Sequence, residues 1–321
     1  MKKLKLWMMI AALGLSLMLS GCSEKAAEGP RIGVIQLMEH TSLNMIYDSF
    51  KEELEALGYQ DGGNCTIVFK NAQGEQSNIG SIVSSFQSEK LDVVVAIATP
   101  TAQSAAKLAE TTPVIFSAVT DPITSGLTSS LEHPNQNITG TSDEVAVAQI
   151  LDLKTLGMIY NVGEVNSQTN IAKAKEAAEK RGLTVIEAPV ANTSEVAQAT
   201  QVLSEKCDAL FSPNDNTVAT AMSTVTQITR SAGIPVYVGA DSMVMDGGTA
   251  TIGINYVELG KETARMVDQV LKGTDVSAIP VKVFNENLSV YVNTDALEEL
   301  HLTLPESLAA DARLVTLKDP Q

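Results

Sequence analysis

The chain has 321 residues, enough for two compact domains. It carries 22 basic and 38 acidic side chains, a net charge of −16. Three lysines and no acidic residue lie within residues 1–21, so residues 22–321 hold a net charge of −19. This balance argues against nucleic acid or an anionic lipid surface as a partner.

The first residues have the pattern of an export signal. Met1-Lys-Lys-Leu-Lys precedes an apolar stretch over residues 6–19, which ends in Leu-Ser-Gly and then Cys22. This pattern predicts a lipoprotein signal peptide over residues 1–21, with Cys22 as the lipidated first residue of the mature protein. The alternative is a plain signal in which Cys22 is incidental. We expect a tether over residues 22–30 and a place at the bacterial cell membrane, lipid-anchored on its extracytoplasmic face. Stable anchoring would need at least two acyl chains.

Strands and helices alternate from residue 31 onward. Short apolar runs predict buried strands, and apolar residues at helical spacing predict helices, the first of them ended by Gly58. The predicted strands are 31–37, 65–69, 91–98 and 114–117, and the predicted helices are 43–57, 79–86 and 101–110. This alternation is typical of an α/β fold with a parallel sheet between helices.

A polar stretch over residues 121–137 interrupts the rhythm, and a second series of the same kind follows. Its predicted strands are 155–160, 183–188, 207–211 and 236–239, and its predicted helices are 167–180, 194–205 and 215–231. The strands 250–254, 281–284 and 288–292 and the helix 256–272 are too few for a third domain. The pattern therefore predicts two Rossmann-like lobes with parallel sheets, which these last elements complete by crossing between them. We place the N-terminal lobe at residues 31–141 plus about 254–285, and the C-terminal lobe at 142–253 plus about 286–321.

Cysteine and histidine give no sign of a metal site. With Cys22 acylated, Cys65 and Cys207 remain, either as two buried thiols or as a disulfide. The three histidines stand apart from one another and from the cysteines. We expect no metal and no cofactor.

Polar residues follow six of the predicted strands at the point where each strand ends. Ligands collect at the carboxyl ends of parallel strands, where helix N-termini offer unpaired N–H groups to a small carboxylate. Each residue could instead cap its own helix, but this is improbable for six junctions around one cleft. The junctions are residues 38–42, 99–101, 118–122, 161–167, 212–216 and 240–242.

Catalytic signatures are missing. No G-x-S-x-G elbow, P-loop or G-x-G-x-x-G opens a helix, so we expect no enzyme. Asp121, Asp215 and Asp241 could converge, and without metal-ligand spacing they suit a ligand ammonium. Glu39 and His40 are neighbours in a loop, which suits a pH-sensitive contact or a surface pair better than a catalytic dyad.

Taken together, the lipobox and the junctions resemble the TrpX-like ABC transporter substrate-binding proteins over nearly all of the mature chain. The motifs that carry the likeness are Met38-Glu39-His40, Ala98-Thr99-Pro100-Thr101-Ala102, Val119-Thr120-Asp121-Pro122, Gly140-Thr141-Ser142-Asp143, Tyr160-Asn161 with Glu164 and Asn166-Ser167, Asn214-Asp215-Asn216-Thr217 and Gly239-Ala240-Asp241. Two departures stand out. The segment around Asp152 is short, and Thr41-Ser42 stands where relatives often carry proline and alanine.

The resemblance implies a periplasmic-binding type I fold, in which two lobes joined by three crossovers close on an amino acid, most often an aromatic one. A ligand carboxylate would be held at Thr99, Thr101 and Thr120. The implied roles of the other candidates are the ammonium partners Asp215 and Asp241, the closing residues Asn161, Asn166, Ser167 and Asn216, the side-chain contacts Met38, Tyr160 and Tyr256, and the further contacts Glu39, His40, Ala118, Asp121 and Ser142.

The expected function is ligand capture for an ABC importer, with a permease and its ATPase as partners and the binding protein as a monomer. A lipid-anchored sensor that presents the same ligand to a membrane receptor is an alternative that the sequence leaves open. A secreted hydrolase is disfavoured because a nucleophile paired with a base is missing.

Overall fold

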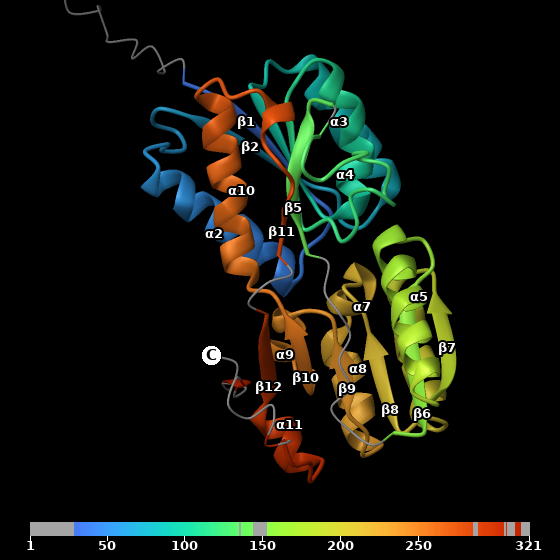
Figure 1. Cartoon of the computed structure of the whole chain (residues 1–321). Coiled ribbons are helices and arrows are strands. Elements are labelled where there is room, and N and C mark those ends of the chain that lie inside the picture. The colour runs from blue at the N-terminus through green and yellow to red at the C-terminus, as the bar shows by residue number, and fades with distance from the viewer. Residues whose placement is uncertain are drawn as a thin grey trace, which may run out of the picture.

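The computed structural model describes residues 29–134, 136–143, 153–284, 288–304, 306 and 312–315, and these form two α/β lobes (Figure 1). The predicted signal peptide, Cys22, most of the tether and the short segment around Asp152 lie outside the described residues. Within the described ranges, no helix is both long and apolar enough to cross a membrane.

The first lobe is built on a six-stranded parallel sheet in the order β11-β5-β4-β3-β1-β2. Its strands are β1 (Arg31–Gln36), β2 (Thr66–Asn71), β3 (Val93–Ile97), β4 (Val114–Ser117), β5 (Ile138–Ser142) and β11 (Lys282–Val283). Its helices are α2 (Thr41–Ala56), α3 (Gln76–Ser88), α4 (Thr99–Ala105), α10 (Tyr256–Leu271) and the 3₁₀ turns η1 (Ala106–Glu110) and η2 (Val276–Ala278). Every residue of β3 is buried, because helices cover the sheet on both faces.

The second lobe holds a seven-stranded sheet in the order β13-β12-β10-β9-β8-β6-β7. Its strands are β6 (Thr155–Asn161), β7 (Thr184–Val190), β8 (Ala209–Ser212), β9 (Val236–Val238), β10 (Ala250–Gly253), β12 (Ser289–Asn293) and β13 (Ala312–Val315). Its helices are α5 (Val165–Lys180), α6 (Thr193–Ser204), α7 (Asn216–Thr220), α8 (Met222–Ser231), α9 (Asp241–Met245) and α11 (Thr294–Glu299). The prediction of parallel sheets fails at one pair, since β12 runs antiparallel to β10.

The chain passes between the lobes three times: from β5 to β6, from β10 to α10, and from β11 to β12. After the second crossing, α10 packs along α2 of the first lobe (Figure 1). The helices approach closely at Gly260, where an added Cβ would lie 2.1 Å from the Ser49 hydroxyl and 2.4 Å from the Ile46 carbonyl oxygen. Only glycine fits there, and it fixes α10 against the first lobe.

Most predicted elements appear within a few residues of their expected bounds. Two differ in kind. The helix predicted at 101–110 begins at Thr99 and tightens to a 3₁₀ turn at Ala106, and the helix predicted at 215–231 is two helices separated at Ala221. The sequence did not predict the strands β5 and β13 or the short helices α9 and α11. Cys65 and Cys207 are buried free thiols.

Candidate functional site

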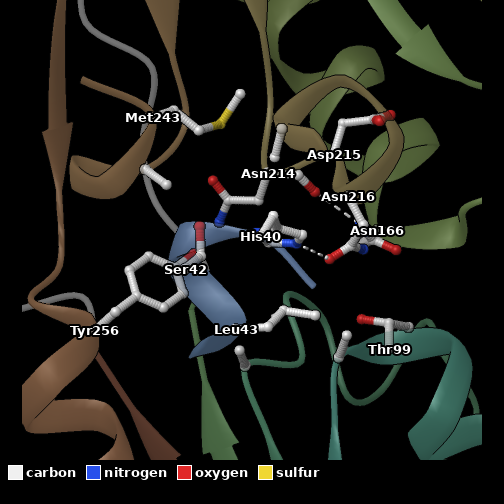
Figure 2. Close-up of a pocket in the computed structure, with 14 residues that line it drawn as sticks. His40, Ser42, Leu43, Thr99, Asn166, Asn214, Asp215, Asn216, Met243 and Tyr256 are labelled. Atoms are coloured by element: carbon white, nitrogen blue, oxygen red, sulfur yellow. Dashed lines mark hydrogen bonds between the residues drawn. The ribbon is translucent and has the colours of Figure 1, made fainter. Parts of the chain in front are cut away.

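A pocket lies between the lobes at the carboxyl ends of both sheets (Figure 2). The strand order reverses between β1 and β3 in the first sheet and between β6 and β8 in the second, and such switch points are where open α/β sheets bind ligands. All six predicted junctions contribute to its wall. The lining residues are His40, Ser42, Leu43, Ala98, Thr99, Ala118, Asn166, Asn214, Asp215, Asn216, Ala219, Ala240, Met243 and Tyr256.

His40, at the start of α2, lies near the centre of the pocket (Figure 2). Burial lowers the pKa of His40 to about 4, so its imidazole is neutral at neutral pH. Its Nε2 lies 3.1 Å from Asn216 Oδ1. Because the Asn216 amide nitrogen donates to Glu164, its oxygen is the acceptor and His40 Nε2 carries the proton. His40 Nδ1 is therefore a bare acceptor, and it is buried without a partner.

Two further polar atoms in this pocket lack a partner. Asn166 donates its amide N–H groups to the Asn214 carbonyl and to Glu164, which leaves its Oδ1 as an open acceptor. The Thr99 hydroxyl is buried and unbonded. Nine buried side-chain atoms among the described residues lack a hydrogen-bond partner, and three of them gather here. Leaving a buried polar group unpaired costs about 1–3 kcal/mol, so this cluster favours a ligand that would pair with it.

Backbone strain is concentrated in the same wall. Ala98 has φ 83° and ψ 154°, and Ala118 has φ 55°, and both line the pocket. Non-glycine residues in these regions cost roughly 1–3 kcal/mol each and cluster at binding sites. The two alanines follow β3 and β4 directly, so the strain lies where the strands turn toward the pocket.

Two carboxylates of the second lobe, Asp215 and Glu164, are in contrast bonded within that lobe. Asp215 caps α7 by accepting the Val218 N–H at 2.8 Å, and its other oxygen accepts the Asn161 N–H at 2.5 Å. Glu164 accepts from the backbone N–H groups of Asn216 and Thr217 and from the Thr217 hydroxyl. Burial and the nearby Glu164 raise the pKa of Asp215. These two acids hold the first turn of α7 in place.

A third buried carboxylate, Asp143, joins the two lobes beside the crossovers. It accepts the Tyr256 hydroxyl at 2.7 Å, the Thr120 hydroxyl at 2.9 Å and the Asn214 amide at 3.0 Å. Burial raises the pKa of Asp143. Because Tyr256 and Asn214 line the pocket, Asp143 fixes two of its walls without lining it.

Three consecutive residues at the start of α2 reach across to the second lobe. His40 contacts Asn216 as described, the Thr41 hydroxyl donates to Asp246 Oδ1 at 2.9 Å, and the Ser42 and Ser242 hydroxyl oxygens lie 2.5 Å apart. On the same side, the Thr220 hydroxyl lies 3.1 Å from the Met38 sulfur. These contacts hold the lobes together over the pocket.

The structure brings seven of the seventeen predicted site residues to the pocket: His40, Thr99, Ala118, Asn166, Asp215, Asn216 and Tyr256. Asp215 lines it, but its carboxylate points away from the centre and is bonded within its own lobe (Figure 2).

The other ten predicted residues do not line the pocket, and most have structural partners. Thr101 donates to the Ile97 carbonyl, Thr120 to Asp143, Ser142 to the Thr120 carbonyl, Tyr160 to Glu187 and Asn161 to Thr217. Ser167 bonds Asp215, Asp121 accepts from Thr124, Asp241 accepts the Ser242 N–H, Met38 contacts Thr220, and Glu39 is exposed. Burial raises the pKa of Asp241 to about 6.

Several lining residues were not predicted as site residues. Ala98, Ala219 and Ala240 carry no chemistry that a sequence pattern could reveal, while Leu43 and Met243 fit a packing role equally well. Ser42 and Asn214 lie within predicted junctions, beside residues that were chosen.

Comparison with known proteins identifies the family of the chain. The family model described as ABC transporter substrate binding protein matches residues 31–316. A tyrosine-binding protein of Clostridioides difficile (strain R20291) is 35% identical over 97% of this chain and 94% of that protein. The crystal structure of an ABC domain from Streptococcus pneumonia in complex with L-Trp is 36% identical, with a TM-score of 0.85 over 90% of this chain and 100% of that one.

A second solved structure has a similar sequence identity but a different arrangement of its lobes. The ligand-free, open form of a Clostridium difficile substrate-binding protein with adhesive properties is 37% identical over the same shares of both chains, yet its TM-score is 0.67. Since identity and coverage match those of the L-Trp complex, the higher score to that complex indicates that the two lobes of this chain are arranged more as in the L-Trp complex than as in the open form. From the family model and these relatives, the chain belongs to the ABC transporter substrate-binding proteins, a family of solute-binding proteins rather than enzymes.

Proposed function

We propose that this chain captures an aromatic amino acid, tyrosine, tryptophan or phenylalanine, for an ABC importer. It would work as a monomer at the extracytoplasmic face of the membrane, anchored through lipid on Cys22, and would hand its ligand to a permease driven by an ATPase. The observation that carries the proposal is the set of three unpartnered polar atoms in the pocket between the lobes.

The chemistry of these atoms suits a zwitterion. His40 Nδ1 and Asn166 Oδ1 are acceptors, which an ammonium group could bond with its N–H donors. The Thr99 hydroxyl can donate to a carboxylate. The side chains of Met243 and Tyr256 lie on the other side of His40 in Figure 2 and Leu43 lies below it, so a ring could pack against these apolar and aromatic groups.

The mechanism follows from where these groups lie. Thr99 and His40 belong to the first lobe and Asn166 to the second, so one ligand would bridge both. A ligand that contacts both lobes stabilises only the closed state, and closure buries it from water. The relatives support an aromatic ligand, since one is a tyrosine-binding protein and another was solved with L-Trp.

Binding is tested with residues 22–321, which contain no tryptophan because the one tryptophan of the chain is Trp7. Equilibrium dialysis with free tryptophan, followed by its fluorescence, and calorimetry with tyrosine and phenylalanine should give micromolar or tighter binding. No retention of any of the three would refute the proposal. Incorporation of labelled fatty acid in cells, lost in Cys22→Ala, tests the anchor.

Thr99→Val gives a sharper test of the pocket. The hydroxyl has no partner in the protein, so its loss should leave the free energy of unfolding unchanged or higher, while affinity falls about 5–10-fold. The matched control is Thr200→Val, because the buried Thr200 hydroxyl donates to the Val196 carbonyl at 2.7 Å in α6. The control should lose about 1 kcal/mol of stability and no affinity. If Thr99→Val binds the ligand as tightly as the wild-type protein, the Thr99 hydroxyl does not contact the ligand.

A further inference from the structure

The hydroxyl pair Ser42 and Ser242 is buried where the two lobes meet. Ser42 lies in the first turn of α2 and Ser242 in α9, and both are buried. Their oxygens are 2.5 Å apart, and Ser42 lines the pocket. A hydrogen bond between the two hydroxyls requires the lobes to be closed, and one of its members faces the pocket.

The pair has hydrogen-bonding capacity to spare. Two hydroxyls carry two hydrogens, and only one can lie between the oxygens. Among the described residues, neither hydroxyl has another acceptor or donor within hydrogen-bond reach. One O–H donor and unused lone pairs thus remain in a buried place, where an unmet polar group is costly.

The position of Ser42 indicates which part of a ligand it meets. In Figure 2, Ser42 lies with Tyr256 and Met243 on one side of His40, while Thr99 and Asn166 lie on the other. If the zwitterion occupies the Thr99 and Asn166 side, the side chain of the ligand extends toward Ser42. The neighbouring Tyr256 hydroxyl and Asn214 amide nitrogen both donate to Asp143, while the hydrogen that the serine pair has to spare has no acceptor in the protein.

The geometry points to the Ser42–Ser242 pair as a specificity determinant that bonds the polar atom on the ring of the ligand. This inference rests on the proposed function. The phenol oxygen of tyrosine can accept the spare hydrogen, and the indole N–H of tryptophan can donate to a spare lone pair. Phenylalanine offers neither, so it leaves the pair unsatisfied and binds more weakly.

The test compares three ligands in two variants of the same helix. Wild-type protein should bind tyrosine and tryptophan about 5–10-fold more tightly than phenylalanine. Ser42→Ala should lower the affinity for tyrosine and tryptophan by about the same factor and that for phenylalanine by less than about 2-fold. The control is Ser49→Ala, since Ser49 is buried on α2, bonds only its own helix and does not line the pocket. It should leave all three affinities unchanged.

Each other result overturns the inference. Equal losses for all three ligands in Ser42→Ala would mean that the pair only holds the lobes together. Equal affinities of the wild-type protein for the three ligands would mean that it does not distinguish their rings. The proposal that it binds amino acids would be unaffected. Failure of the wild-type protein to bind any of the three would instead refute the proposed function. If Ser42→Ala does not fold, Ser242→Ala carries the same comparison, because it removes one hydroxyl of the pair from the opposite lobe.

Discussion

The turns that begin α4 and α7 border the same pocket but are built in opposite ways. Asp215, directly before α7, and Glu164, directly before α5, are acidic residues whose oxygens all accept from N–H and hydroxyl groups at the start of α7 and nearby. Before α4, Ala98 is strained, no side chain caps the helix, and the Thr99 hydroxyl is unpaired. The difference indicates that the acidic residues beside the pocket hold its loops, while neutral groups without hydrogen-bond partners face the pocket.

The largest effect should come from Asp215→Ala. It leaves the Asn161 and Val218 N–H groups buried and unpaired, so the free energy of unfolding should fall by about 2–4 kcal/mol. Urea denaturation measures this loss. The matched control is Asp275→Ala, which removes an exposed cap of η2 and should lower the free energy of unfolding much less. A variant of wild-type stability that has lost ligand binding would show that the Asp215 carboxylate contacts the ligand after all.

An intermediate effect should come from acidification. The pKa of His40 is about 4 in the folded protein and near 6.5 when unfolded, so the unfolded chain binds the proton more tightly. The contribution of His40 to stability is therefore complete above pH 6.5 and is lost as the pH falls toward 4. Affinity should be flat above pH 5.5 and fall as Nδ1 is protonated near pH 4, because an imidazolium cannot accept from an ammonium.

His40→Phe tests this assignment. It should weaken binding about 10-fold at pH 7 and lack the part of the pH dependence that arises from His40. Asp143, Asp215, Asp241 and Asp246 also titrate with raised pKa values and remain in the variant. If the affinity of His40→Phe falls between pH 6 and 4 as it does in the wild-type protein, the titrating group is one of these carboxyl groups and not His40. Calorimetric titrations of both proteins across this range distinguish the outcomes.

The smallest effect should come from the ion pair that crosses the lobes at the surface. Lys173 Nζ lies 3.8 Å from Asp121 Oδ2, with nearly half of the lysine side chain exposed. Exposed pairs contribute about 0–1 kcal/mol, so Lys173→Ala should change affinity less than about 2-fold. A higher salt concentration should change the affinity of the wild-type protein by a similarly small factor. A larger loss of affinity in Lys173→Ala would show that this ion pair stabilises the closed arrangement of the lobes.

The sequence predicts most of the architecture, because the spacing of apolar residues determines where strands and helices form. The prediction fails where polar residues are buried. Strand β5 has the sequence Ile-Thr-Gly-Thr-Ser, yet all five residues are buried. Its hydroxyls are satisfied by partners far away in the chain, Thr139 by the Ile279 carbonyl and Thr141 by Thr263. No local pattern reveals such partners. The break at Ala221 between α7 and α8 is equally invisible, since the apolar spacing continues through it.

The candidate site shows the same division. The rule that ligands bind at strand ends predicts where the pocket lies, and all six junctions contribute to it. Which polar atoms at these strand ends lack a hydrogen-bond partner depends on contacts that form only when the chain folds. Thr99 and Thr101 are two residues apart and chemically identical, but Thr101 bonds the Ile97 carbonyl while Thr99 bonds nothing.

The strained alanines have a consequence for the thermodynamics of recognition. Glycine would adopt the backbone angles of Ala98 and Ala118 at no steric cost, but it would also permit many other shapes in the empty protein. A methyl group at each position restricts the backbone conformations that the ligand-free protein can adopt. The conformational entropy of these two turns is therefore lost during folding, and ligand binding does not have to order them.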